Sequence, residues 1–102
     1  MMTIPDIAGT GATVQIVLPN PARWVQFALT GSGTARIGGS CAANGSTTGF
    51  PSAATSTQGV PVVAGNNAGF MAPFMGQFSF YQATEFSAYI PSGATLSVAA
   101  KE

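Results

Sequence analysis

The chain has very few charged residues and no histidine. Six of its 102 residues are charged, which is 6% against about 25% in an ordinary globular domain, and three cations balance three anions. Because nucleic-acid binders need a basic surface, no nucleic-acid partner is expected. The apolar content of 46% is too high for a disordered charged tail and is sufficient for a core.

The missing histidine also removes most catalytic and metal chemistry. It excludes the commonest general base, the Ser–His and Cys–His nucleophile pairs and most structural zinc sites. A pair of catalytic carboxylates needs two rigidly held acids, and Asp6 and Glu102 lie near the chain ends, which leaves Glu85. No helical pattern follows Gly31-Ser32-Gly33, so these glycines indicate a turn and no dinucleotide site. We expect no enzyme activity, catalytic residue, cofactor or metal.

Cysteine and long apolar runs are scarce as well. Cys41 is the only cysteine, which excludes a disulfide scaffold and fits a reducing compartment or an assembly without disulfides. No apolar run approaches the roughly 20 residues of a membrane helix, so no membrane partner is expected. Residues 1–6 lack the basic and apolar stretches of a secretion signal, and none is expected.

The scarcity of charge bears on how the surface is used. A folded chain of this mass exposes roughly 5,300 Å², which leaves about one charge per 900 Å². Neutral surfaces of this kind tend to associate. We therefore interpret the chain as a subunit that lies against partners, with a monomer solvated by Ser, Thr, Asn and Gln as the alternative.

The residues that are present alternate with a period of two. Val25, Phe27 and Leu29 alternate with Trp24, Gln26 and Ala28, which predicts a half-buried strand. Similar short runs, separated by glycine and proline, occur at 13–18, 34–37, 60–63, 70–74, 77–81, 85–90 and 94–99. About seven to eight short strands at regular spacing predict an all-β, single-domain antiparallel β-sandwich that is jelly-roll-like.

The connections between these runs carry further expectations. Pro19-Asn20-Pro21 is expected to be a turn, since prolines do not fit a central strand. Gly31-Ser32-Gly33 and Pro91-Ser92-Gly93 are expected to close hairpins. Residues 1–12 are expected to be an N-terminal arm that orders on a neighbouring subunit, with the sandwich over 13–100. The uncharged segment Gly38–Gln58 either hides a strand at 49–53 or lies on a partner.

Several apolar side chains are candidates for contacts with a partner. Two phenylalanines and two methionines crowd residues 69–76, where they form either an exposed patch or core on both faces. Trp24 lies opposite the apolar face of its strand, as an interface anchor or as a cap over the sandwich edge. The resulting interface hypothesis comprises Met2, Ile4, Trp24, Phe70, Met71, Phe74 and Met75.

Two smaller groups of residues suggest other roles. Trp24 with Tyr81 and Tyr89 would form a stacking platform for a sugar if the three rings came together. Arg36 and Glu85 lie in the middle of predicted strands and are expected to pair across the sheet, with a partner contact for Arg36 as the alternative.

Four segments carry a resemblance to a known class: Trp24-Val25-Gln26, Ala35-Arg36-Ile37-Gly38, Gly59-Val60-Pro61-Val62 and Tyr89–Val98. Over residues 22–99 the chain resembles small β-rich virion proteins of tailed bacteriophages, of the capsid decoration or cement type. The resemblance implies a jelly-roll-like homo-oligomer, a dimer or trimer, that binds the outer face of the major capsid protein and stabilises the head.

The same resemblance implies synthesis in the host cytoplasm and a final location on the phage capsid surface. The alternatives are another phage structural subunit, in the tail, collar or head fibre, or a carbohydrate- or receptor-binding module.

Overall fold

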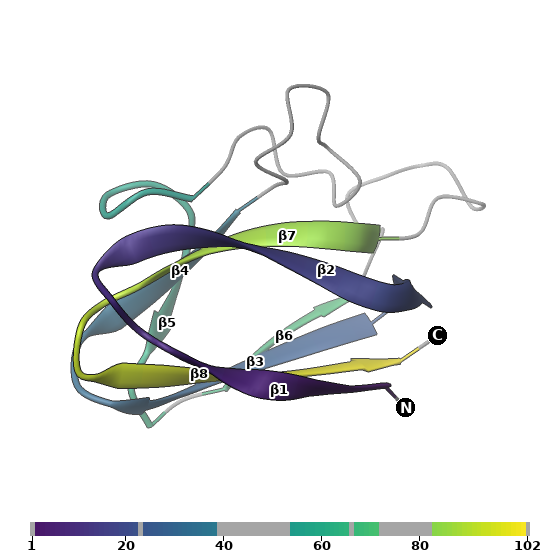
Figure 1. Ribbon diagram of the computed structural model, residues 1–102, viewed down its shortest axis with the longest axis horizontal. Helices are drawn as coiled ribbons and strands as arrows, with labels where there is room; N and C mark the ends of the chain where they lie inside the picture. The colour runs from purple at the N-terminus through teal and green to yellow at the C-terminus, as the bar shows by residue number, and fades with distance from the viewer. Residues whose placement is uncertain (1, 23, 39–53, 66, 72–82, 102) are drawn as a thin grey trace.

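The computed structural model describes residues 2–22, 24–38, 54–65, 67–71 and 83–101. These residues form eight strands in two antiparallel sheets and no helix (Figure 1). The strands are β1 (Met2–Ala8), β2 (Ala12–Ala22), β3 (Trp24–Gly31), β4 (Thr34–Gly38), β5 (Val60–Val63), β6 (Asn67–Met71), β7 (Ala83–Ile90) and β8 (Ala94–Lys101). The predicted all-β sandwich is confirmed.

The order of the strands is that of a jelly roll. Sheet A has the order β1-β8-β3-β6, and sheet B has the order β2-β7-β4-β5. The first strand pairs with the last, the second with the seventh, the third with the sixth and the fourth with the fifth. This nested pairing places long antiparallel strand pairs in two facing sheets, as in eight-stranded jelly rolls.

Neither of the two predicted hairpins forms. The turn at residues 31–33 leads from β3 in sheet A to β4 in sheet B, and the turn at 91–93 leads from β7 in sheet B to β8 in sheet A. The second turn is where expected, and the Ala94 N–H donates to the Pro91 carbonyl at 3.2 Å. Both turns cross between layers because the flanking strands place their apolar faces on opposite sides of one core.

The predicted turn at Pro19-Asn20-Pro21 is wrong, because these residues belong to β2. β2 is an edge strand of sheet B, and its register with β7 becomes irregular between Val17 and Ala22. Proline is tolerated in an edge strand at such an irregularity, where its missing N–H breaks no ladder. The strand therefore passes through both prolines.

The N-terminal segment lies within the sandwich. β1 pairs with β8 in sheet A, and Ile4 and Ile7 pack against the core. Ile4 lies opposite Val98 and Ile7 opposite Leu96, so β1 holds one more residue than β8 over this interval. This β-bulge keeps both isoleucines on the inner side while Pro5 and Asp6 are exposed. The segment thus pairs with a strand of its own chain, whereas an arm ordered on a neighbouring subunit was expected.

The core lies between the sheets, as the alternation predicts. Val25, Phe27 and Leu29 of β3 are buried from sheet A, and Phe86, Ala88 and Ile90 of β7 are buried from sheet B. The rings of Phe27 and Phe86 meet edge to face across the layers, with centroids 5.4 Å apart and planes at 80°. Such pairs contribute about 0.5–1.5 kcal/mol beyond the area they bury.

The segment before β5 covers part of the outer face of sheet B. The Ala54 N–H donates to the Ser87 hydroxyl at 2.7 Å, and the Ala54 carbonyl accepts from the Thr13 hydroxyl at 2.9 Å. Ser87 is fully buried although it alternates with the core residues of β7. Within the described part of the expected contact loop, Ala54 thus lies on the chain's own sheet, whereas residues 55–58 are exposed. Residues 39–53, which include the strand suggested at 49–53, lie outside the described residues.

Candidate interaction surface

The outer face of sheet A has few charged side chains among the described residues. Its centre is formed by β3 and β8, on which Gln26 lies opposite Ala99 and Ala28 lies opposite Ser97. All four side chains are half-buried, and each alternates with a core residue. Cross-strand partners share a face of a sheet, so these residues form two adjacent rows across its middle.

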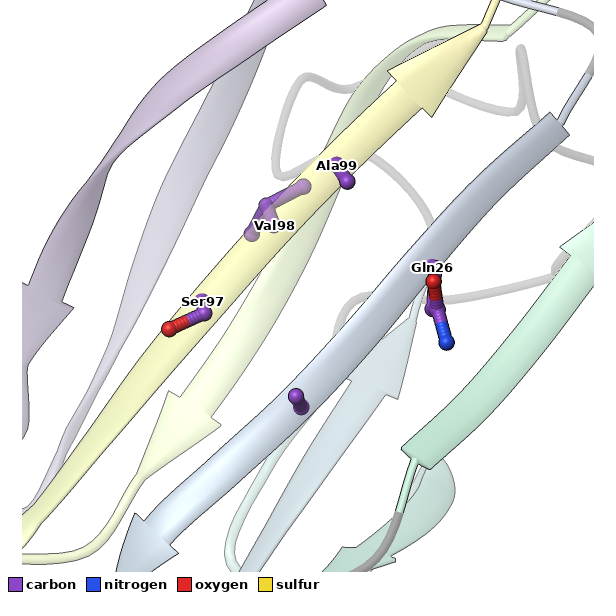
Figure 2. A pocket seen from close by; sticks show the side chains of 5 residues that line it. Gln26, Ser97, Val98 and Ala99 are labelled. Carbon is purple, nitrogen blue, oxygen red and sulfur yellow. The ribbon is translucent and has the colours of Figure 1, made fainter.

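A shallow depression of about 160 Å³ lies in this face. It is lined by Gln26, Ala28, Ser97, Val98 and Ala99. Figure 2 shows the Gln26 side chain directed away from β8 and the Ser97 side chain directed away from β3. The depression exists because alanine and serine occupy neighbouring positions where larger side chains would fill the space between the strands.

Trp24 borders the same face and is half-buried. Its backbone lies opposite Lys101 of β8 and opposite Met71 of β6, in the row next to Gln26 and Ala99. Because Val25 beside it is fully buried, the alternation directs Trp24 outward. The prediction that Trp24 lies on the side opposite the core face of its strand is confirmed.

The charges of this face lie at its margins. Lys101 is exposed at the end of β8, and Asp6 is exposed in the bulge of β1. Arg36 and Glu85 belong to sheet B. Among the described residues, the middle of the sheet A face therefore carries no charged side chain.

The outer face of sheet B has a different character. Among the described large apolar side chains, Val17 and Val63 are exposed, at 63% and 48%. Val17 is in β2 and Val63 in β5, which are the two edge strands of this sheet. In each strand the valine alternates with a buried residue, Leu18 or Val62, and therefore faces outward.

The predicted ion pair between Arg36 and Glu85 is wrong. In register, Arg36 lies opposite Tyr89, which is four residues along β7 from Glu85, or roughly 13 Å at the rise of a strand. The Arg36 guanidinium instead donates to the Gly59 carbonyl at 3.1 Å. Arg36 thus holds the start of β5 beside β4.

The described members of the predicted contact set lie in sheet A, and most are at one end of it, since Met2, Ala100, Val25 and Phe70 follow one another in register across its four strands. Ile4 is half-buried and packs against the chain's own core, and its contact with a partner stays a prediction. Met2 begins β1, and Phe70 and Met71 lie in β6, where Phe70 is opposite Val25 and Met71 opposite Trp24. Phe74 and Met75 lie outside the described residues.

The predicted sugar platform is not assembled. Trp24 is on the outer face of sheet A, whereas Tyr89 is on the outer face of sheet B, with the core between them. Tyr81 lies outside the described residues. Rings on opposite sides of a sandwich cannot stack on one sugar, so this three-residue site is wrong.

Comparison with protein-family models, with curated proteins and with solved structures finds no match to this chain. The resemblance to phage virion proteins therefore stays a prediction. The jelly-roll assignment rests on strand pairing in the structure alone, and fold by itself does not assign a function.

The described ranges contain neither a membrane-spanning helix nor a cluster of metal-ligand side chains. No helix there has the length and hydropathy to cross a membrane. Nor do three His, Cys, Asp or Glu side chains gather there as ligands for a metal ion.

Sequence reasoning missed several surface features. The depression was hidden because Ala28, Ser97 and Ala99 look unremarkable in a small-residue chain, and only the register joins them. The exposure of Val17 had a visible signal, since it lies out of phase with Ile16 and Leu18. The buried Ser87 had none, because its cover comes from a segment 33 residues away in the chain.

Proposed function

We propose that this chain is a structural protein of a virus particle: a capsid decoration protein that binds the outer face of a phage major capsid protein and stabilises the head. The jelly roll supports the proposal because this fold is common in viral capsid domains, although it also serves in lectins. The surface chemistry carries more weight than the fold.

The observation that carries the proposal is a folded surface with little charge and with exposed valines at two edges. The whole chain exposes 5245 Å² and has six charged residues. Val17 and Val63 present apolar surface on the same outer face of sheet B. Burial of each against a partner contributes roughly 1 kcal/mol, since part of each side chain is already covered.

The proposed mechanism follows from repetition of a modest contact. A standard interface buries about 800 Å² on each partner. A small subunit bound across the seam between two capsid proteins adds that contact at every equivalent position of the shell. Since the chain has no net charge, many copies bind the same shell without mutual repulsion.

Titration of purified expanded heads, from a tailed phage whose genome encodes the chain, tests the proposal by co-sedimentation. The wild-type chain is expected to bind saturably, and Val17→Asp is expected to weaken binding about tenfold, since about 1.4 kcal/mol corresponds to that factor. Ser92→Asp adds the same charge in the exposed turn before β8 and is expected to bind like the wild type.

The titration also has outcomes that contradict the proposal. Failure of the folded wild-type chain to bind heads at micromolar concentration would remove it. Binding to tails and not to heads would favour the alternative of another phage structural subunit. Equal losses in both variants would show that Val17 is not part of the contact.

A further inference from the structure

We propose that two copies of this chain associate through the outer faces of sheet A, with Trp24 of each copy seated in the depression beside Ala28 and Ser97 of the other. The shape, register and charge of one face support this association. It does not depend on the proposed function.

The face has an outward-directed aromatic side chain, Trp24, and a depression of matching scale. Trp24 is half-buried and directed outward. The depression of about 160 Å³ is lined from the next two rows along the same strands, that of Gln26 with Ala99 and that of Ala28 with Ser97 (Figure 2). An apolar cavity of about 150 Å³ accommodates a benzene ring, so the hollow is on the scale of an aromatic side chain. Within one copy Gln26, which also lines the depression, lies between Trp24 and Ala28 along β3.

A single two-fold rotation places Trp24 of each copy over the depression of the other. We place its axis in the plane of the face, perpendicular to the strands, over the row of Gln26 and Ala99. Successive rows on one face are about 6.6–6.8 Å apart. The rotation therefore lays the Trp24 row of one copy over the row of Ala28 and Ser97 in the other. The reverse contact forms equally, so the association closes as an isologous dimer.

The same rotation brings opposite charges together. Lys101 is in the Trp24 row, so it is laid over the Ser97 row of the second copy. At that level β1 contributes its bulge with Asp6, because Ile4 and Ile7 lie opposite Val98 and Leu96 on either side of Ser97. Each Lys101 thus approaches Asp6 of the other copy, one strand away and across facing sheets about 10 Å apart.

This complementarity identifies the occupant as a second copy of the chain. Among the described residues, the face has one cation and one anion at its margins, and the rotation pairs each with its opposite. Between them lie only small or neutral side chains, which bring no desolvated charge into the contact. A foreign partner would have to match the hollow and both charges independently.

Sedimentation velocity on the full chain, without capsids, measures the association. Wild-type protein is expected to sediment as a species with twice the 10.2 kDa mass of the chain. Dilution is expected to shift the emission of Trp24, the only tryptophan, to longer wavelength as the indole leaves the hollow. Ala28→Gln, which fills the depression, is expected to weaken the dimer at least tenfold.

A charge exchange supplies the matched control. Lys101→Glu places two acidic groups together and is expected to weaken the dimer, whereas the double variant Lys101→Glu with Asp6→Lys is expected to restore it. Ser92→Gln enlarges a side chain in the turn before β8 and is expected to leave association unchanged. Circular dichroism of each variant confirms that the sandwich is intact.

The proposal is overturned by a wild-type chain that stays monomeric, or by a dimer that neither Ala28→Gln nor Lys101→Glu weakens. Loss of association in Lys101→Glu without recovery in the double variant also contradicts the stated pairing. Because no head is present, these outcomes are independent of the capsid titration.

Discussion

Gly31 and Gly93 lie against each other at the end of the sandwich where the chain crosses between sheets. Both have positive φ, of 97° and 89°. A Cβ on Gly31 would collide with the Gly93 carbonyl oxygen and the Ala94 Cα, whereas a Cβ on Gly11, at φ 77°, would meet nothing within 4 Å. A comparison of alanine at Gly31 with alanine at Gly11 therefore separates the cost of steric collision from the cost of a positive φ.

Gly31→Ala is expected to destabilise the fold by more than about 3 kcal/mol, because backbone collision adds to left-handed strain. Gly11→Ala is expected to cost about 1–2 kcal/mol, from strain alone. Urea unfolding of both variants measures the difference. Equal losses would contradict the close approach of the two turns.

The Phe27–Phe86 pair joins the two sheets at the centre of the core. Phe27→Ala is expected to cost about 3–5 kcal/mol, since both rings are buried and the cavity would lie between layers. Val63→Ala, at an exposed position, is expected to change the unfolding free energy by less than about 0.5 kcal/mol. Denaturant unfolding of the two variants checks that Phe27 faces the core and Val63 faces outward. Similar losses of stability in both variants would contradict these orientations.

At the scale of the element, periodicity predicted strands but not their partners. The run 60–63 coincides with β5, and the alternations at 23–30 and 94–99 correspond to β3 and β8. Alternation indicates which side of a strand is apolar. Two consecutive strands show the same alternation whether they pair in a hairpin or lie in facing sheets, so the pattern does not decide between the two arrangements. The two turns at 31–33 and 91–93 were therefore recognised as turns and assigned to hairpins.

Ala54 is bonded to the outer face of sheet B through Thr13 and Ser87, and we call this contact the strap. Sequence patterns cannot reveal a contact of this kind. Ser87→Ala removes the acceptor of a buried N–H, so it is expected to cost about 1–3 kcal/mol and to speed hydrogen exchange at Ala54. Thr55→Ala removes exposed hydrogen bonds within 55–58 and is expected to cost less. Hydrogen exchange with mass spectrometry compares the two, and unchanged protection of Ala54 in Ser87→Ala would contradict the strap.

β1 provides a direct contrast between a strand and an arm. Ile7→Ala is expected to lower stability by roughly 1–3 kcal/mol, below the cost at a fully buried site because Ile7 is half-buried. Thr10→Ala, at an exposed position after the strand, is expected to be neutral. Thermal unfolding at low concentration distinguishes them, and an unaffected Ile7→Ala would indicate that the segment is not docked.

For the whole molecule, the sequence predicted the class of fold from spacing and the neutral surface from composition. It could not assemble the candidate surface, because the hollow and the marginal charges come from β1, β3 and β8, which are far apart in the chain. Tertiary register alone brings Asp6, Ala28 and Lys101 to one face. The separation of Trp24 from Tyr89 was hidden for the same reason.

The scarcity of charge also bears on the proposed binding to capsid heads. Head binding is expected to change by less than about threefold between about 0.05 and 0.5 M salt, because few charged contacts are available for screening. Co-sedimentation across this range measures the effect. A steep loss of affinity with salt would mean that electrostatic contacts dominate and would contradict an apolar interface.

Cryo-electron microscopy of expanded heads mixed with saturating protein tests the proposed function most directly. Added density is expected on the outer surface at symmetry-related positions, with a copy number fixed by the capsid lattice and the jelly roll lying over contacts between capsid proteins. Bare heads at saturating concentrations of folded protein would contradict it.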